Sequence, residues 1–508
     1  MSAINKILIA NRGEIAVRII RACCEAGITS VAVYSDPDRT AFHVRAADEA
    51  YPVAGPTSIE SYLAQEKIIQ IAKTCGAQAI HPGYGFLAEN DRFADLCRKN
   101  DLIFIGPSPE TIRHLGDKLE ARRTAAKAGL PLVPADDQDV DDAEAAKRVA
   151  KKIGYPILIK AAAGGGGKGM RIVKSPDELA AALKTASSEA SSAFGDKRVY
   201  IEKYLARPRH VEIQILADKH GNVIHLGERE CSIQRRHQKV IEESPSPAVD
   251  EKMRSRMGEA ATALARESGY IGAGTVEFLV DENLDFYFLE VNTRLQVEHP
   301  VTEMVTGIDL VQEQFKIAAG ERLSVRQSDV SRRGHAIECR IYAEDVAAGF
   351  IPSTGHLAAY HEPSGPGVRV DSGCVAGDDI SVYYDPLIAK LITWGADHPQ
   401  AIGRMRRALK EYVVQGVETT IPFGLLVVDN PRFIEGRLST HFIADEFPDL
   451  AASVQQSEDE MELAAMAAAL IDFQNKTRII SAGTQKKTGV DPWKLSGRVS
   501  GMRKERQT

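Results

Sequence analysis

A glycine-rich stretch between two apolar runs constrains the fold more than any other local feature of this chain. The stretch AAAGGGGKGM covers residues 161–170, after YPILIK and before RIVK. Glycine lets backbone N–H groups approach phosphate oxygens, so the composition favours phosphate binding. A dinucleotide fingerprint needs a helix directly after the loop, and a P-loop needs Ser or Thr after its lysine. Here a strand-like run follows, and Gly169 stands after Lys168. The sequence therefore predicts a hairpin with a glycine tip that covers a nucleotide, with a loose surface hairpin as the alternative.

The N-terminal segment has the pattern of a parallel α/β unit. The strand KILIA is followed by the loop NRG and a helix with Ile15, Ile19 and Cys23 on one face. Gly27 ends that helix, and the apolar run TSVAVYS predicts a second strand. AQAIHPGYGF and LIFIGPS repeat the pattern of a strand that runs into a Gly/Pro loop. Ligand sites of parallel sheets lie at such strand ends.

Further elements follow along the chain. SPDELAAAL predicts a helix with Ser175 as N-cap and Glu178 completing a capping box. TVEFLVDENLDFYFLEVN predicts a hairpin with DENLD as its turn. Beyond Gly334 the chain becomes rich in strands and turns, with a helix at AIGRMRRALKEYVV. EDEMELAAMAAALIDF predicts a helix near the end, and the basic segment 486–508 is too poor in apolar residues for a core.

Composition excludes several classes of function. The 508 residues carry a net charge of −7, so no basic excess points to nucleic acid or to an anionic membrane surface. No stretch approaches the roughly 18 apolar residues of a membrane span. The seven cysteines are scattered and form no CxxC pair. We therefore expect reduced thiols and a cytoplasmic protein that binds neither nucleic acid nor membrane.

Five polar residues stand at alternate positions in FYFLEVNTRLQVEHP. In an extended chain they would all face one side of the strand. Oxygen ligands two residues apart suit Mg²⁺, which binds carboxylates together with nucleotide phosphates. Glu277, on the preceding strand, is expected to face this row across the hairpin. The pattern predicts a metal site, with a solvated polar strand face as the alternative. The five are Glu290, Asn292, Arg294, Gln296 and Glu298.

A dense cationic cluster lies in ECSIQRRHQK. It contains Arg235, Arg236, His237 and Lys239. Nucleic-acid contact is a weak interpretation, because the chain is acidic and the run lacks interleaved aromatic residues. The cluster favours a site for a small oxyanion, and a solvated loop is the alternative.

Taken together, these stretches resemble the biotin carboxylase family, the ATP-grasp component of biotin-dependent carboxylases. The resemblance covers roughly residues 4–448, and its motifs stand in the family's order. EVNTRLQVEHPVTE combined with SIQRRHQK is far more specific than the glycine loop. The other matching stretches are KILIANRGEIAVRIIRA, IHPGYGFLAEN, GGGGKGM, IEKYL, RHVEIQ, GHAIECRIYAED and YYDPLIAKLI.

The resemblance implies a mixed α/β ATP-grasp fold with four parts. A Rossmann-like N-terminal domain would cover residues 1–116, and the ATP-grasp domain 117–333. A mobile lid at about 132–204 would carry the glycine loop. A β-rich C-terminal domain would cover 334–448, followed by a tail at 449–508.

The family's nucleotide and metal positions can be carried over residue by residue. The metal, Mg²⁺ or Mn²⁺, is expected at Glu277, Glu290 and Asn292. The segment EKYL would hold adenine, and the lysines and glycines the phosphates. The residues implied for ATP binding are Lys118, Lys160, Gly166, Gly167, Met170, Glu202, Lys203, Tyr204, Leu205, His210, Gln234, His237, Glu277 and Glu290.

The implied reaction is MgATP-dependent carboxylation of biotin with bicarbonate, through carboxyphosphate. Glu298 matches the general base that takes the bicarbonate proton. Arg340 matches the cation that stabilises the biotin enolate. The bicarbonate and biotin pocket is matched by Lys239, Arg294, Gln296, Val297 and Arg340, and the catalytic residues are Lys239, Arg294, Glu298 and Arg340.

The resemblance also implies partners. The chain has no AMKM-like biotinylation site, because LAAMAAAL contains Ala-Met but no lysine. The biotin is therefore expected on a separate carrier protein, and the carboxyltransferase on another subunit. The final acceptor stays open among acetyl-CoA, propionyl-CoA, another acyl-CoA and pyruvate. The segment DPWKLSGR suggests that the tail docks one of these subunits.

A homodimer is expected from the family's interface positions. Arg21, Glu25 and Arg369 match that surface, whereas Pro366 stands where some members carry an aromatic residue. Two other functions fit the motifs less well. Another ATP-grasp ligase would show a duplicated half or lack SIQRRHQK, and a silent nucleotide-binding subunit would have lost the lysines, the metal carboxylates or Glu298.

Overall fold

The computed structural model describes residues 4–135, 143–162 and 170–454, with Met466 and Leu470. The chain divides into two compact units, Met1–Ser453 and Val454–Thr508. Every sheet of the described residues belongs to the first unit. The helix predicted at 458–473 lies outside the described residues except for Met466 and Leu470, which are helical. The basic segment 486–508 also lies outside them.

The N-terminal sheet confirms the predicted parallel α/β start. Its strand order is β3-β2-β1-β4-β5, and all of its pairings are parallel. Helix α1 ends where Gly27 adopts φ 67°, a left-handed conformation that glycine adopts without a steric penalty. The elements are β1 Lys6–Ile9, α1 Gly13–Ala26, β2 Thr29–Tyr34, α2 Phe42–Ala46, β3 Glu49–Pro52, α3 Gln65–Cys75, β4 Ala79–His81, α4 Asp91–Lys99, β5 Ile103–Phe104 and α5 Pro109–Gly116.

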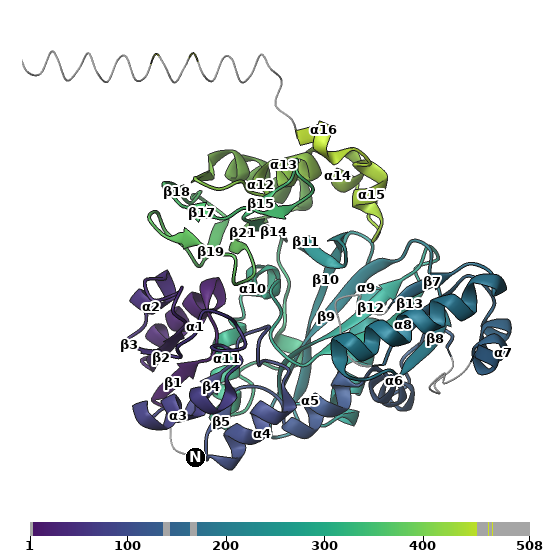
Figure 1. Cartoon of the computed structure of the whole chain (residues 1–508), viewed down its shortest axis with the longest axis horizontal. Helices are drawn as coiled ribbons and strands as arrows, with labels where there is room; N and C mark the ends of the chain where they lie inside the picture. The colour runs from purple at the N-terminus through teal and green to yellow at the C-terminus, as the bar shows by residue number, and fades with distance from the viewer. Residues whose placement is uncertain (1–3, 136–142, 163–169, 455–465, 467–469, 471–508) are drawn as a thin grey trace, which may run out of the picture. The chain divides into compact units, whose positions relative to one another are not determined.

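A small three-stranded antiparallel sheet carries the predicted glycine hairpin. Strand β6 (Ile157–Ala161) pairs with β7 (Arg171–Val173), which confirms a strand on both sides of the loop. The loop tip, residues 163–169 with Gly166 and Gly167, lies outside the described residues. Strand β8 (Val199–Lys203) completes the sheet, and helix α8 (Leu179–Phe194) packs on it (Figure 1).

The capping box predicted at Ser175 does not form. The Ser175 side chain makes no capping hydrogen bond, and the Glu178 carboxylate accepts from the backbone N–H of Lys174 instead. A 3₁₀ turn at Pro176–Glu178 therefore precedes helix α8, which begins at Leu179. The same small layer contains helix α7 (Ala143–Ile153), and the connection to the N-terminal sheet contains α6 (Lys118–Lys127).

An eight-stranded antiparallel sheet forms the centre of the unit. Its order is β13-β12-β9-β10-β11-β14-β21-β19. The predicted hairpin is confirmed, because β12 and β13 pair antiparallel on either side of the turn. The sheet continues across residue 334, where strand β11 pairs with β14. The strands are β9 Arg209–Ala217, β10 Val223–Arg235, β11 Gln238–Ser244, β12 Gly272–Val280, β13 Phe286–Asn292, β14 His335–Tyr342, β19 Val368–Ser372 and β21 Leu387–Gly395.

Helices and short strands cover this sheet. Helix α9 (Glu251–Glu267) packs on β9 and β10, and α10 (His299–Thr306) packs on β10, β14 and β21 (Figure 1). The predicted helix near residue 400 is confirmed as α12. The remaining elements are α11 Leu310–Ala318, the 3₁₀ turn Gln327–Asp329, β15 Glu344–Asp345, β16 Ile351–Pro352, β17 Gly355–His356, β18 Ala359–His361, β20 Asp379–Ile380, α12 His398–Glu411, β22 Val413–Gln415, α13 Ile421–Asp429, α14 Pro431–Ile434, α15 Phe442–Glu446 and α16 Leu450–Val454.

Two further expectations concern thiols and membrane spans. All seven cysteines are free thiols, as predicted from their scatter. Among the described residues, the search for a helix with the length and apolar character of a membrane span finds none.

Candidate active site

A cavity of about 930 Å³ opens between the small sheet and the central sheet. Its wall combines residues that stand far apart in the sequence, from Glu89 to His441. Among the predicted site residues, those lining it are Lys118, Lys160, Met170, Glu202, Lys203, Tyr204, Leu205, His210, Gln234, His237, Lys239, Glu277, Glu290, Asn292, Arg294, Gln296, Val297 and Arg340. Glu298 is 0% exposed and lies behind the wall, in contact with two lining residues.

Lysines and carboxylates are paired at the end of the cavity expected to hold ATP. Lys160 forms an ion pair with Glu202, and both side chains are buried. Lys118 Nζ lies 3.4 Å from the carboxylate of Glu290. Bringing a triphosphate to these lysines would exchange protein carboxylates for phosphate oxygens, which carry more charge. Both ammonium groups therefore lie in the cavity wall, each beside a carboxylate.

Part of the predicted adenine-binding segment makes hydrogen bonds within the protein. The backbone N–H groups of Lys203 and Tyr204 donate to the carbonyls of Pro134 and Pro156. The Lys203 ammonium donates to the carbonyls of Gly154 and Tyr155, at 3.0 and 3.2 Å. In this arrangement the two N–H groups and that ammonium fix the segment rather than face a base. Adenine recognition would fall to other groups of the segment.

The predicted row of alternating polar residues is only partly a strand. Strand β13 ends at Asn292, so the extended geometry expected up to Glu298 is wrong beyond that residue. Arg294 and Gln296 still line the cavity, because the irregular segment after the strand turns along its wall. Glu298 is the N-cap residue of helix α10 and not a strand residue. Val297, which the family resemblance assigned to the bicarbonate pocket, also lines the cavity.

The expected metal ligands meet at the end of the hairpin. Glu277 and Glu290 are direct partners in the register of β12 and β13, as predicted. Asn292 donates from Nδ2 to Glu277 at 2.8 Å, and its Oδ1 accepts from Arg294 at 3.1 Å. Adjacent carboxylates that line the cavity together with lysines fit the oxygen ligands of Mg²⁺. Burial raises the pKa of Glu277, but the charges of Lys239 and His210 outweigh it and keep that pKa well below its ordinary value.

Lys239 holds three carboxylates together at the base of the cavity. Its Nζ lies 2.5 Å from Glu212, 2.9 Å from Glu277 and 2.6 Å from Glu298. Burial lowers the pKa of Lys239, yet the three negative charges dominate and raise it well above its ordinary value. The Lys239 ammonium is therefore permanently charged at the base of the cavity.

Glu298 is bound between two cations. Its Oε1 accepts from Lys239, and its Oε2 accepts from Arg340 at 3.0 Å. Burial by itself raises the pKa of Glu298, but Lys239, Arg340 and Arg229 lower it more, so the pKa falls well below its ordinary value. Arg340 also donates to Glu242 at 2.6 Å. The group is thus a carboxylate at neutral pH, with one cation on each oxygen.

Three residues that contact the predicted site residues were not predicted from the sequence. Glu89 accepts from Arg294 Nε at 2.9 Å and also from the backbone of Thr293. Glu212 accepts from Lys239, and Arg229 holds Glu212 from the other side through a 2.5 Å contact. Glu89 and Glu212 stand inside the motifs IHPGYGFLAEN and RHVEIQ, which could have pointed to them. Arg229 lies in ERECSIQRRHQKVIEE, a stretch that also matches the family, but no local pattern marks it as buried.

Arg229 supports the carboxylates around Lys239 from within the protein core. It is 0% exposed and donates to Glu212, Gln214, Thr275 and Thr302. A buried guanidinium is stable only with its donors paired, and these four acceptors come from strands β9 and β12 and helix α10. Arg229 thereby joins the elements that carry the carboxylates of the site.

Comparisons with known proteins agree along the whole first unit. Residues 3–112 match the family model of the biotin carboxylase N-terminal domain. Residues 117–326 match that of the carbamoyl-phosphate synthase L chain ATP-binding domain. Residues 338–445 match that of the biotin carboxylase C-terminal domain. The flanking matches distinguish the chain from other ATP-grasp ligases.

Individual relatives are similar over most of their length. A biotin carboxylase of Nostoc sp. is 55% identical over 441 residues, which are 87% of this chain and 99% of the relative. Biotin carboxylase 1 of Bacillus subtilis is 54% identical over 441 residues, 87% of this chain and 98% of the relative.

A solved structure gives the same result. The biotin carboxylase domain dimer of Hydrogenobacter thermophilus 2-oxoglutarate carboxylase, in complex with MgADP, ADP and bicarbonate, is 48% identical. It superposes with a TM-score of 0.86 over 90% of this chain and 100% of that chain. These matches show that the chain belongs to the biotin carboxylase family, the ATP-dependent ligases that carboxylate biotin in the first half-reaction of biotin-dependent carboxylases.

Proposed function

We propose that Glu298 is the general base of this biotin carboxylase. Lys239 and Arg340 would stabilise the negative charges that develop beside it during the reaction. The observation that carries the proposal is the placement of one fully buried carboxylate between two cations at the base of the cavity. Such a carboxylate is ionised at neutral pH and is therefore able to accept a proton. The same two cations also make Glu298 a weaker base. When bicarbonate binds, it must therefore draw Lys239 partly away from Glu298, so that Glu298 becomes basic enough to take the proton.

The bicarbonate pocket would be formed by Lys239, Arg294 and Gln296 with the backbone of Val297. Arg294 Nη1 lies 3.0 Å from Gln296 Oε1, so the two side chains support one another at the wall. The Val297 carbonyl is held by Lys390 at 2.9 Å. Glu298 takes the proton of bicarbonate. The freed oxygen then forms a bond to the γ-phosphorus of ATP while the bond to ADP breaks, which gives carboxyphosphate. Carboxyphosphate then breaks down to CO₂ and phosphate, the phosphate takes the N–H proton of biotin, and the biotin nitrogen bonds to CO₂ while Arg340 stabilises the enolate.

Glu277 and Glu290, with Asn292 beside them, would hold Mg²⁺. When bound, the ion neutralises charge on the transferring phosphoryl group and its leaving partner. The two carboxylates face each other across the hairpin, so both reach a cation at the cavity end of the sheet. Lys118 and Lys160 supply further positive charge from outside this hairpin.

Glu290→Gln is expected to weaken Mn²⁺ binding in the presence of ADP by about tenfold or more, because one charged oxygen ligand is lost. Mn²⁺ electron paramagnetic resonance measures this without turnover. The matched control is Glu282→Gln in the exposed turn of the same hairpin, which should bind Mn²⁺ as the wild type does. Unchanged binding in the Glu290 variant would remove Glu290 from the metal site.

The activity itself is tested by release of ADP from ATP. With bicarbonate present, free biotin is expected to stimulate ADP release by the pure chain, because the family uses biotin as the carboxyl acceptor. Omitting bicarbonate should abolish the stimulated fraction. Absence of any biotin-stimulated, bicarbonate-dependent release would defeat the proposal.

The proposal also includes partners. The biotin would be on a separate carrier, the carboxyltransferase would be another subunit, and the tail would dock one of them. Deleting residues 451–508 should leave ADP release with free biotin intact, because the described residues that line the cavity all lie before 451. The same deletion should lose assembly with the cognate carrier and transferase in co-purification. Unchanged assembly would show that the tail does not dock them.

The homodimer is supported by the surface around helix α1. Arg21 and Glu25 are exposed, and they line a hollow of about 350 Å³ together with Arg369. Arg369 donates to Glu303 at 2.7 Å, which connects this surface to helix α10 and hence to the Glu298 end of the site. The solved Hydrogenobacter thermophilus relative is a dimer of such domains. The final carboxyl acceptor stays open among acetyl-CoA, propionyl-CoA, another acyl-CoA and pyruvate, and the cytoplasmic location stays a prediction.

A further inference from the structure

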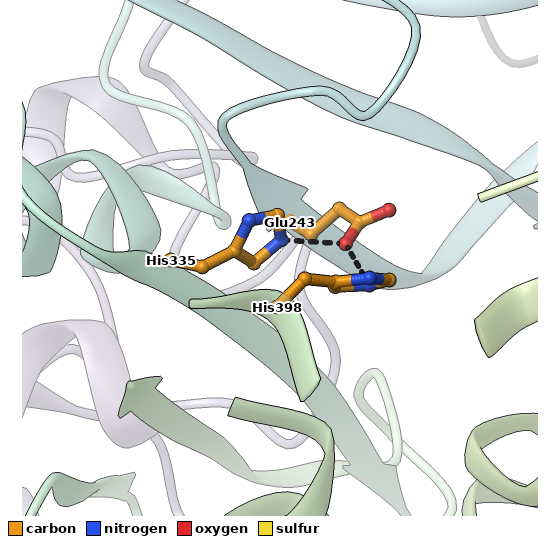
Figure 2. A group of neighbouring side chains, drawn as sticks. All are labelled: Glu243, His335 and His398. Atoms are coloured by element: carbon orange, nitrogen blue, oxygen red, sulfur yellow. Dashed lines mark hydrogen bonds and ion pairs between the residues drawn. The ribbon is translucent and has the colours of Figure 1, made fainter. Parts of the chain in front are cut away.

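Two histidines and a glutamate converge at a point outside the catalytic cavity (Figure 2). His335 Nε2 lies 2.7 Å from Oε2 of Glu243, and His398 Nε2 lies 3.0 Å from the same oxygen. The three residues come from strand β11, from the first position of β14 and from the first position of helix α12. None of them lines the cavity.

The cluster is buried except for part of the His398 side chain. Glu243 is 1% exposed and His335 is also buried, whereas the side chain of His398 is 18% exposed. The two imidazole rings lie 4.6 Å apart between their centroids. The exposed part of His398 therefore lies away from its Nε2 atom, which is buried beside Glu243, while the sheet fixes the other two side chains.

The hydrogen bonding within the cluster is incomplete. Glu243 Oε1 is buried and has no hydrogen-bond partner. His398 Nε2 is also buried, and its partner at 3.0 Å is the Oε2 atom that His335 already contacts. Buried polar atoms are almost always paired in folded proteins, and an exception calls for an explanation such as a bound ion.

The donor set identifies the class of ion. Two imidazole nitrogens with one carboxylate oxygen are typical ligands of Zn²⁺, whereas Mg²⁺ prefers oxygen ligands alone. In a tetrahedral site with metal–ligand distances of about 2.0–2.1 Å, neighbouring ligand atoms stand roughly 3.3 Å apart. The two nitrogen–oxygen separations here are 2.7 and 3.0 Å, and all three ligand atoms lie within 4.8 Å of one another. Small side-chain shifts would suffice.

We propose that Glu243, His335 and His398 form a binding site for Zn²⁺ or a similar divalent transition-metal ion. The ion would take the Nε2 lone pairs of both histidines and an oxygen of Glu243, and water would complete its coordination. Neither the ATP site nor the biotin site contributes a ligand.

The position of this site gives it a structural role. Strand β11 also carries Lys239, and strand β14 also carries Arg340. Glu243 and His335 thus lie on the two adjacent strands that deliver both cations of the Glu298 centre. Helix α12 contributes His398 from outside the sheet. Zn²⁺ would fix these three elements to one another without touching substrate.

The test uses the full-length chain, stripped with a chelator and titrated with Zn²⁺ against a chromophoric chelator. One Zn²⁺ per chain is expected. His398→Gln should weaken that binding by about tenfold or more, because one of three ligands is lost. Co²⁺ should give the absorption of a nitrogen-ligated tetrahedral site in the wild type and lose it in His398→Gln. Zn²⁺ should raise the melting temperature of the wild type but not of this variant.

Two controls separate this site from other zinc ligands. His356→Gln changes an exposed histidine that pairs with Asp379, and it should leave Zn²⁺ binding unchanged. Glu277→Gln alters the His210–Glu212–Glu277 group in the cavity, which also has metal-binding geometry. It should likewise leave the stoichiometric Zn²⁺ in place.

The outcomes are distinguishable. Failure of the wild type to bind Zn²⁺ stoichiometrically would overturn the proposal. So would equal weakening by His356→Gln, or loss of the ion in Glu277→Gln rather than in His398→Gln. If His398→Gln unfolds, Glu243→Gln with a melting curve provides the same comparison.

Discussion

Glu298→Gln is expected to lower kcat for bicarbonate-dependent ADP release by about 10²–10⁴-fold, the range typical for loss of a general base. Glutamine has nearly the same shape but cannot accept the proton of bicarbonate. ATP binding should persist, because Glu298 lies behind the cavity wall and the phosphate lysines contact other carboxylates. Steady-state kinetics and nucleotide calorimetry measure the two effects separately.

The fold should survive this change. Lys239 keeps Glu212 and Glu277, and Arg340 keeps Glu242, so neither cation is left unpaired. The matched control is Glu321→Gln, which neutralises an exposed carboxylate and should change neither parameter. A kcat close to that of the wild type in Glu298→Gln would mean that another group takes the proton.

Lys239→Met is expected to have the second large effect, and it acts on both stability and pH dependence. The change removes the ammonium that Glu212, Glu277 and Glu298 share, and so leaves buried carboxylates with less positive charge. Removing one partner of a buried ion pair costs about 3–5 kcal/mol of unfolding free energy. Loss of an electrostatic donor to the reacting anion should lower kcat by about 10²–10³-fold.

The pH profile tests the cause of that loss. In the wild type the pKa of Glu298 is depressed, so Glu298 stays ionised and kcat/KM should show no acid limb from it near neutral pH. Lys239 is the largest of the charges that lower this pKa, and without it burial raises the pKa. An acid limb should therefore appear at higher pH in Lys239→Met. The depressed pKa of Glu298 also stabilises the fold at pH values above the pKa that this carboxyl has in the unfolded chain. This stabilisation is lost as the pH falls toward the pKa of the folded state.

Lys410→Met is the control, because Lys410 is exposed and its replacement removes the same charge. This variant should keep the stability, the rate and the pH profile of the wild type. A Lys239→Met variant with an unshifted profile would show that Lys239 does not set the protonation state of Glu298.

The features predicted correctly from the sequence were those fixed over short distances. Strands on both sides of the glycine loop follow from the apolar runs themselves, and this excluded two common nucleotide-binding motifs. The facing of Glu277 and Glu290 follows from a short hairpin turn, which leaves little freedom of register. Motif order gave the family, because several specific stretches had to occur together.

Local patterns also failed where a competing contact prevailed. The capping box at Ser175 was lost because Glu178 accepts from Lys174. The alternating row ended at Asn292 because helix α10 begins soon after it and turns Glu298 inward. Alternation predicts a common face only while the chain stays extended.

The sequence by itself determined the family, the hairpins and most of the residues around the cavity. Only the tertiary structure decided how their charges are balanced. Glu89 meets Arg294 across 205 positions, Arg340 reaches Glu298 from a different strand, and Arg229 holds four acceptors while fully buried. His335 and His398 reach Glu243 only because the central sheet continues across residue 334. The physical reason is that ionisation and metal affinity depend on distances of a few ångströms, and sequence separation does not report such distances between strands that pair across a fold.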